Sequence, residues 1–165
     1  MPERCPVLTV RQPWSWALLH GKTVENRTWE MKYRGPLWLH AGARSRWDPD
    51  GEASSLVQAA WCAGWGAGKL AHLNRRTDEM AFGAVTALVE VTGCHHARDC
   101  VGPAWVRDAF PHVLCSPWAA WDQFHIEFSN VRELPHPVPC KGSLGLWRLP
   151  DEVEKAVREQ LEVRQ

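Results

Sequence analysis

The chain has 165 residues, of which 45% are apolar, and its 19 Lys and Arg balance 19 Asp and Glu. A domain of this size buries roughly 70% of the surface that its unfolded chain exposes, so its stability requires neither disulfides nor a metal. The composition excludes an intrinsically disordered chain, and no apolar run approaches the ~20 residues that span a membrane.

The first half of the chain alternates strand patterns with one helix. Pro13 suits the first turn of a helix, because its missing N–H has no partner to lose there, and Gly21 is a natural stop. A turn is expected at 34–36. Apolar and polar residues alternate with period two in the flanking segments, which is typical of half-buried strands. The predicted strands cover residues 7–10, 23–29 and 37–41, and the predicted helix covers 13–19.

The rest of the chain, from residue 53 on, is expected to contain three more strands and three helices. The predicted strands cover 84–91, 124–129 and 144–149, and the predicted helices cover 53–65, 103–110 and 151–163, with a loop at 69–79. Pro135, Pro137, Pro139 and Gly142 read as turn signals between the last two strands. About six short strands with flanking helices predict an α+β fold, a small barrel or half-barrel in a single domain.

Charge is distributed unevenly along this neutral chain. Residues 4–46 contain eight Lys and Arg against two Glu, a balance of +6, whereas residues 77–165 contain eight basic and thirteen acidic residues, a balance of −5. Such a chain can present one basic face, as nucleic-acid-binding proteins do, although its net charge is zero. The alternative is a set of solvated surface charges.

Lys22, Glu25 and Arg27 form the most informative polar group. On a strand, Glu25 and Arg27 project from the same face, about 6–7 Å apart. We expect them to fix each other's orientation while Lys22 stays free. Such a trio can grip a base edge, because Glu accepts from an exocyclic amine and Arg or Lys donates to a carbonyl or phosphate. The alternative is a surface ion pair of little energetic weight.

Several separated motifs resemble the ASCH domain family, which has a PUA-like fold. The family motif Gly-x-Lys-x-x-Glu-x-Arg matches at Lys22, Glu25 and Arg27, although its first position falls on His20 and the glycine follows as Gly21. Gln-Pro-Trp at 12–14, Arg-Gly at 34–35 and Lys-Gly-x-Leu-Gly-x-Trp at 141–147 are also similar to the family. The resemblance covers roughly residues 7–149 of one domain spanning 1–165, followed by the helix at 151–163.

The resemblance implies a small PUA-like β-barrel of about six strands, with an electropositive cleft between barrel and helices that binds single-stranded or modified-base RNA or DNA. Tryptophans are candidates for base stacking, which contributes about 1–3 kcal/mol per base, although each is also a candidate core residue. The candidate nucleic-acid-binding residues are Arg11, Trp14, Lys22, Glu25, Arg27, Trp29, Arg34, His40, Trp118 and Lys141.

Two further functions stay open. Some small members of the superfamily are amidohydrolases acting on N4-acylated cytidine nucleosides, and others are ribonucleases; Lys22 and Glu25 would be the catalytic residues of such a hydrolase. These amidohydrolases have Thr where this chain has Glu25, and Glu25 would tend to keep Lys22 charged, which favours binding over base catalysis. The other alternative is a protein-interaction module of a coregulator-like complex.

The six cysteines are scattered, and no signal peptide is recognisable at the N-terminus, which indicates a cytoplasmic protein with reduced thiols. Cys94, His95, His96 and Cys100 are close enough in sequence to suggest zinc. They contain no Cys-x-x-Cys pair, however, and adjacent histidines on an extended segment point in opposite directions. We therefore expect neither a metal site nor a cofactor.

Overall fold

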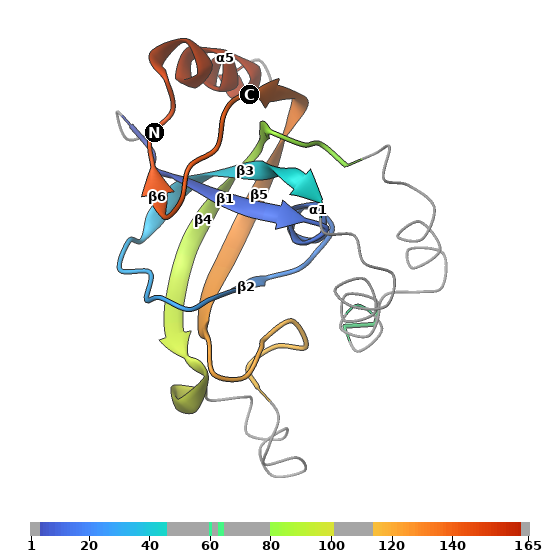
Figure 1. Ribbon diagram of the computed structural model, residues 1–165, viewed down its shortest axis with the longest axis vertical. Helices are drawn as coiled ribbons and strands as arrows, with labels where there is room; N and C mark the ends of the chain where they lie inside the picture. Colours follow the sequence, from blue (N-terminus) through green and yellow to red (C-terminus); the bar gives the residue numbers. More distant parts are fainter. Residues whose placement is uncertain (1–3, 46–59, 61–62, 65–79, 101–113, 163–165) are drawn as a thin grey trace.

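The computed structural model of the chain describes residues 4–45, 60, 63–64, 80–100 and 114–162 (Figure 1). The predicted loop at 69–79 and the predicted helix at 103–110 lie outside these residues, as does most of the predicted helix at 53–65.

A single curled sheet of six strands forms the body of the protein, in the order β2-β5-β4-β3-β1-β6. The strands are β1 (Val7–Gln12), β2 (Val24–Arg27), β3 (Gly35–Ser45), β4 (Ala84–His96), β5 (Phe124–Pro139) and β6 (Leu146–Trp147). Strands β1 and β3 pair in parallel, whereas every other neighbouring pair is antiparallel. With the two α-helices of the described residues, the sheet is an α+β half-barrel consistent with a PUA-like barrel, as predicted.

Apolar side chains fill both sides of the curled sheet because its central strands are covered on each face. One buried cluster includes Leu8, Leu39 and Ile126. A second includes Trp38 and Val157 and joins the sheet to the C-terminal helix. Strand β3 feeds both clusters, since successive side chains on a strand point to opposite faces.

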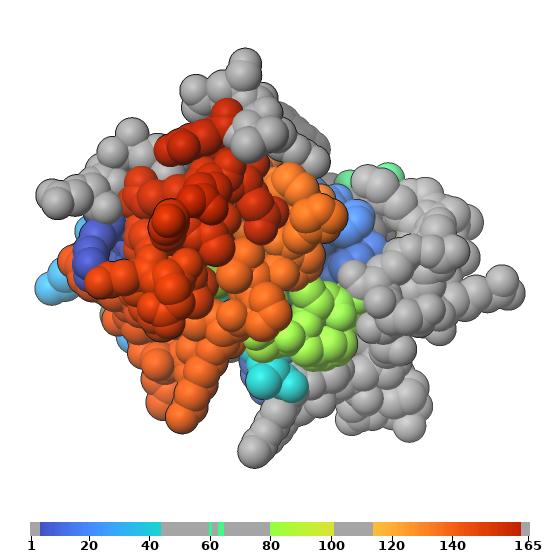
Figure 2. Space-filling model, turned by 90° about the horizontal axis from the view of Figure 1, so that it is seen from above, coloured from blue at the N-terminus to red at the C-terminus, as the bar shows by residue number. Residues whose placement is uncertain are grey.

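Helices α1 (Trp14–Leu19) and α5 (Asp151–Glu162) of the described part of the chain pack on this sheet. Helix α1 follows β1, and the side-chain oxygen of Gln12 accepts a hydrogen bond of 2.9 Å from the Trp16 N–H in its first turn. Helix α5 buries Val157 and Leu161 and covers one end of the molecule beside β5 (Figure 2). No helix in the described part of the chain is long and apolar enough to cross a membrane.

The strand positions predicted from sequence are confirmed, but several lengths were wrong. Strands β4 and β5 extend well beyond 84–91 and 124–129, and β6 is only two residues long. The turn expected from the prolines at 135–139 is the end of β5. Proline is tolerated there because β2 pairs only with residues 124–127 of β5, and the register with β4 is irregular between Glu133 and Val138.

Candidate functional site

Lys22, Glu25 and Arg27 come together at the junction of α1 and β2. The Lys22 Nζ donates to Glu25 Oε2 at 2.7 Å, and the Arg27 Nη2 lies 3.2 Å from Glu25 Oε1. Arg27 Nη2 also donates to the backbone oxygen of Thr9 at 2.7 Å, which ties the network to β1. The carboxylate therefore bridges two cations, and the predicted side-by-side placement of Glu25 and Arg27 is confirmed.

The prediction that Lys22 stays free is wrong. Its side chain is only 1% exposed and is paired with Glu25, whereas that of Arg27 is 24% exposed. Burial lowers the pKa of Lys22, and the neighbouring Glu25 carboxylate opposes that shift only in part. Arg27 is thus the member of the trio that reaches solvent. Lys22 is buried and holds the Glu25 carboxylate in place through their hydrogen bond.

The three candidate stacking tryptophans occupy different environments. Trp14 is half-buried, and its ring centroid lies 5.6 Å from the Lys22 Nζ, a cation–π geometry. Trp29 is also half-buried and packs against the buried cluster that includes Leu8 and Ile126. Trp118 is buried in a third apolar cluster with Trp16 and Val24, so its ring is a core element. Trp14 is therefore the tryptophan that the structure joins to the charged trio.

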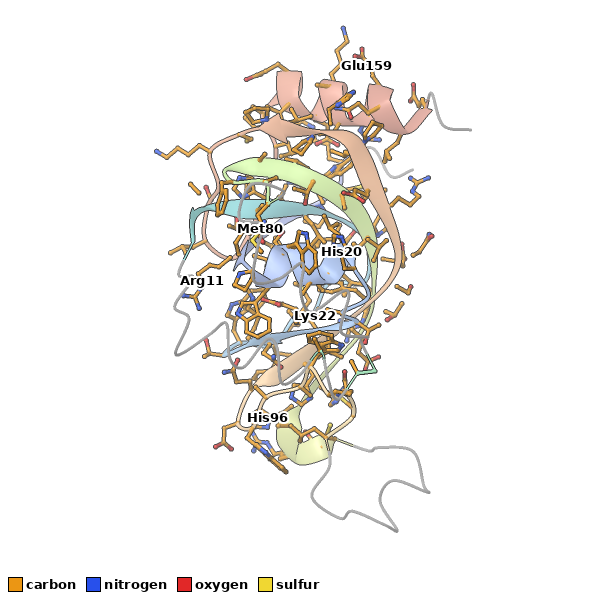
Figure 3. The ribbon with its side chains drawn as sticks, turned by 90° about the vertical axis from the view of Figure 1, so that its right-hand side faces the viewer. Arg11, His20, Lys22, Met80, His96 and Glu159 are labelled. Carbon is orange, nitrogen blue, oxygen red and sulfur yellow. The ribbon has the colours of Figure 1, made fainter. Side chains whose placement is uncertain are left out.

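Of the remaining basic candidates, Arg11 on β1 and Arg34 just before β3 are exposed. The Arg34 Nη1 donates to the backbone oxygens of Met31 and Tyr33, at 2.6 and 2.9 Å, so this side chain holds its own loop together. In Figure 3, Arg11 lies on the side of the molecule that also carries Lys22 and α1.

His40 and the segment containing Lys141 meet where β6 closes onto β1. His40 is 1% exposed, and its Nε2 lies 2.9 Å from the Cys140 carbonyl oxygen. A Cβ at position 142 would lie 2.5 Å from the imidazole Cε1 of His40, so only glycine fits there. Lys141 itself is exposed. Gly142, the first glycine of the Lys-Gly-x-Leu-Gly-x-Trp motif, therefore allows this segment to pack closely against the buried His40 ring.

A pocket of about 240 Å³ opens beside α1. It is lined by Gln12, Trp16, Leu19, His20, Ala81, Thr86, Glu133 and Pro137. The rings of Trp16 and His20 stack with centroids 3.8 Å apart and form part of its wall. Among the described lining residues there is no lysine or arginine, and Glu133 contributes a carboxylate.

Two residues that the sequence analysis did not single out hold the region in shape. The Asn26 Nδ2 donates to the Trp118 carbonyl at 2.8 Å, and its Oδ1 accepts from the Ala120 N–H at 2.9 Å. Thr9 accepts hydrogen bonds from Arg27 at its backbone and from the Trp147 Nε1 at its hydroxyl. Asn26 lies between Glu25 and Arg27 in the sequence, and on a strand its side chain points to the opposite face from theirs. This position could have predicted a structural role for Asn26.

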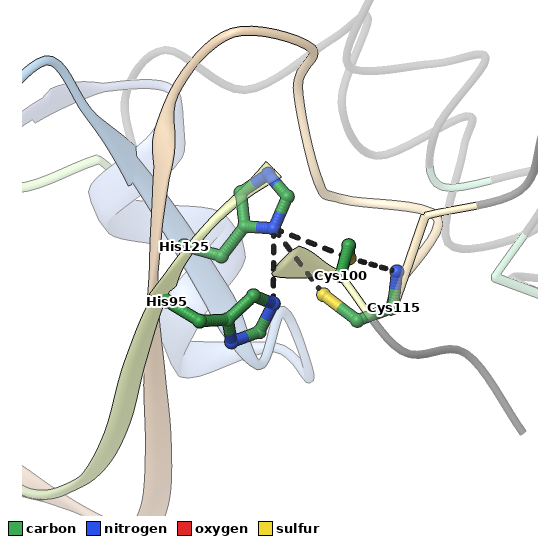
Figure 4. Close-up of side chains that lie close together, drawn as sticks. All are labelled: His95, Cys100, Cys115 and His125. Atoms are coloured by element: carbon green, nitrogen blue, oxygen red, sulfur yellow. Dashed lines mark hydrogen bonds between the residues drawn. The ribbon is translucent and has the colours of Figure 1, made fainter. Parts of the chain in front are cut away.

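The Cys and His residues at 94–100 are not arranged as their sequence proximity suggested. Cys94 Sγ accepts from the Met31 N–H at 3.3 Å, and His96 Nδ1 accepts from Arg98. His95 and Cys100 point instead toward Cys115 and His125 (Figure 4). Two of these four residues are distant in sequence from the group considered above.

Comparison with known proteins supports the motif assignment. The ASCH domain family matches residues 8–134. The chain is 26% identical over 155 residues to human activating signal cointegrator 1 and 25% identical to the mouse protein of that name. Each comparison covers 93% of this chain but only 24% of the relative, so the chain spans about a quarter of the length of these relatives.

Proposed function

Since the chain belongs to the ASCH domain family, we propose that it binds single-stranded nucleic acid on the face formed by α1 and β2. The observation that carries this proposal is the Lys22–Glu25–Arg27 network, in which two cations share one carboxylate and Arg27 reaches solvent. A guanidinium fixed by two contacts loses little further conformational entropy when it binds phosphate or a base carbonyl.

The pocket beside α1 supports a role for an unstacked base. Its volume of about 240 Å³ is below the roughly 300 Å³ at which drug-sized pockets begin, which suits one base rather than a whole nucleotide. Its wall combines the stacked Trp16 and His20 rings with the polar side chains of Gln12 and Thr86. Aromatic faces and polar edges together are what single-stranded bases require.

The test compares three proteins by fluorescence anisotropy with labelled single-stranded RNA and DNA. Arg27→Gln removes the exposed charge of the network, and we expect about tenfold weaker binding, the effect of one charge-assisted contact. Lys155→Gln is the matched control, because Lys155 is a highly exposed cation on α5. Circular dichroism confirms that both variants are folded. Equal affinity of Arg27→Gln and wild type would place any binding elsewhere.

A second candidate function is hydrolysis of N4-acylated cytidine. The lowered pKa of Lys22 favours it, because a desolvated lysine beside a carboxylate can exchange protons with a substrate. Burial of its side chain opposes it, because a substrate must first reach the amine. Chromatography of N4-acetylcytidine after incubation with wild type and Lys22→Met decides this: product formed by wild type alone supports the activity, and no product rejects it.

The cysteines suit a reducing compartment. Cys5, Cys94, Cys100, Cys115 and Cys140, which are the cysteines that the structure describes, are all free thiols. We accordingly propose a cytoplasmic protein. A role as an interaction module in a coregulator complex, suggested by the name of the mammalian relatives, predicts instead a stable protein partner whose capture is unaffected by Arg27→Gln.

A further inference from the structure

The end of the β4–β5 ribbon holds a second group of side chains, far from α5 and distinct from the Lys22 network. His95 is near the end of β4, Cys100 follows the short 3-10 helix Ala97–Asp99, and His125 is the second residue of β5. Cys115 joins them from the loop before β5. Their potential ligand atoms all lie within 4.8 Å of one another (Figure 4).

We propose that His95, Cys100, Cys115 and His125 form a structural zinc site. Three of the distances between their inward atoms, all measured from His125, have the values expected between the ligands of a tetrahedral zinc ion. His125 Nδ1 lies 3.4 Å from Cys115 Sγ, 3.6 Å from Cys100 Sγ and 3.4 Å from His95 Nε2. Ligands at zinc–nitrogen and zinc–sulfur bond lengths at tetrahedral corners are separated by about 3.3–3.8 Å. These three distances therefore fit a zinc ion held between the four side chains.

The outer hydrogen bonds of both imidazoles direct their lone pairs inward. His125 Nε2 is 2.8 Å from the Ala120 carbonyl, and His95 Nδ1 is 3.0 Å from Glu127 Oε1. Both partners accept hydrogen bonds, so each ring places its proton on the outer nitrogen and leaves the inner nitrogen bare. The two inward nitrogens lie 3.4 Å apart, and in this tautomer each offers a lone pair to the same point. A cation placed there would accept both lone pairs and both sulfurs.

The surroundings of His95 are built to hold a carboxylate behind the ring. A Cβ at position 93 would lie 2.5 Å from Glu127 Oε2, so Gly93 makes room for this side chain. A carboxylate bound to the outer nitrogen of a ligating histidine fixes the ring orientation and raises its basicity. On the sulfur side, the Cys115 N–H donates to Cys100 Sγ at 2.8 Å, which stabilises a thiolate.

Four protein ligands leave no open position for water or substrate, which is the mark of a structural site. Binding of Zn²⁺ by two thiols and two neutral imidazoles releases the two thiol protons and yields a neutral centre. Because the ligands come from β4, β5 and the segments between them, the metal would fasten the end of this ribbon. The site does not depend on the function proposed for the Lys22 network.

The experiment measures the metal content of the full chain purified without chelators, by mass spectrometry of the metal. We expect about one zinc per chain in wild type, near zero in Cys100→Ser/Cys115→Ser, and about one in Cys94→Ser. Cys94→Ser is the matched control, because Cys94 adjoins His95 but contacts the Met31 N–H instead.

Cobalt substitution of wild type provides a second readout that requires no variant. Apoprotein titrated with Co²⁺ should show intense tetrahedral d–d bands and a thiolate-to-cobalt charge-transfer band that saturate at one equivalent. Absence of these bands overturns the proposal, as does equal metal content in the double variant. A Cys100–Cys115 disulfide in the freshly purified protein, detected by free-thiol titration, also overturns it.

Discussion

The contact between Lys22 and Glu25 shows how one buried charge is held in place. Lys22 is almost wholly removed from water, a position that strongly disfavours an ammonium unless a carboxylate compensates it. Glu25 supplies that partner at 2.7 Å, and Arg27 balances the second carboxylate oxygen. Each ion pair of the network thus offsets part of the desolvation cost of burying the other charges.

Removing both partners should therefore cost less stability than the sum of the two single removals. We expect Lys22→Met to lower the free energy of unfolding by about 3 kcal/mol, because Glu25 loses its closest counter-charge. The double variant Lys22→Met/Glu25→Gln should be less destabilised than the sum of the single variants, by more than about 1 kcal/mol. Urea denaturation followed by tryptophan fluorescence measures all three, and strictly additive losses would refute the coupling.

His40 should make stability depend on pH. Burial lowers the pKa of His40, so as the pH falls the unfolded chain binds a proton first, near its ordinary pKa of about 6.5. The contribution of this residue is fully present above that pH and declines as the pH falls below it. The loss of unfolding free energy between about pH 7.5 and about 5.5 should be smaller in His40→Gln than in wild type. An identical loss in the two proteins would contradict this account.

At the residue level, sequence spacing predicted the contact of Glu25 with Arg27 because residues two apart on a strand share a face. It did not predict the burial of Lys22. That depends on α1 and β2 closing around the side chain, which is tertiary packing. The sequence does not reveal the contact of His125 with His95, because the two residues are 30 positions apart and only the strand register brings their side chains together.

Among the elements, the short strand β6 depends most on a single glycine. Its Trp147 donates to the Thr9 hydroxyl at 3.1 Å and packs edge-on against His40. The preceding segment passes so close to His40 and Thr9 that a Cβ at position 142 has no room. The motif around Gly142 therefore closes the sheet edge, a role that its sequence alone does not reveal.

Gly142→Ala should consequently displace this segment. The added methyl would lie 2.5 Å from the buried His40 ring and 3.0 Å from Thr9 Oγ1, so we expect a loss of about 1–3 kcal/mol in unfolding free energy. Ser143→Ala, at the exposed neighbouring position, is the control and should change stability by less than about 0.5 kcal/mol. Thermal or urea unfolding measures the stability of both variants. Equal stability would show that the segment shifts to accept the methyl group without cost, contrary to this prediction.

The elements whose sequence patterns were strongest were predicted best. Helix α5 follows the predicted range closely because its apolar residues recur at helical spacing. Strand β5 was cut short in the prediction because prolines normally end strands. The structure retains the strand through Pro139, since this stretch lies beyond β2 and has an irregular register with β4. Such compensation depends on neighbouring strands and is invisible in a local pattern.

For the whole molecule, the curled sheet separates three regions. Helix α5 covers one end, the Lys22 network and the α1 pocket lie along one side, and the His95–His125 group lies toward the opposite end, as the positions of Glu159, Lys22 and His96 indicate in Figure 3. This separation means that loss of the proposed metal should leave the charged network intact.

The most direct test of the account is the salt dependence of single-stranded RNA binding by wild type, Arg27→Gln and Lys155→Gln. A small face that contacts about three phosphates predicts a log–log slope near −2 for wild type. For Arg27→Gln we predict weaker binding and a slope shallower by about 0.7, with Lys155→Gln unchanged. If Arg27→Gln keeps both the affinity and the slope of wild type, the Lys22–Glu25–Arg27 network does not form the nucleic-acid interface.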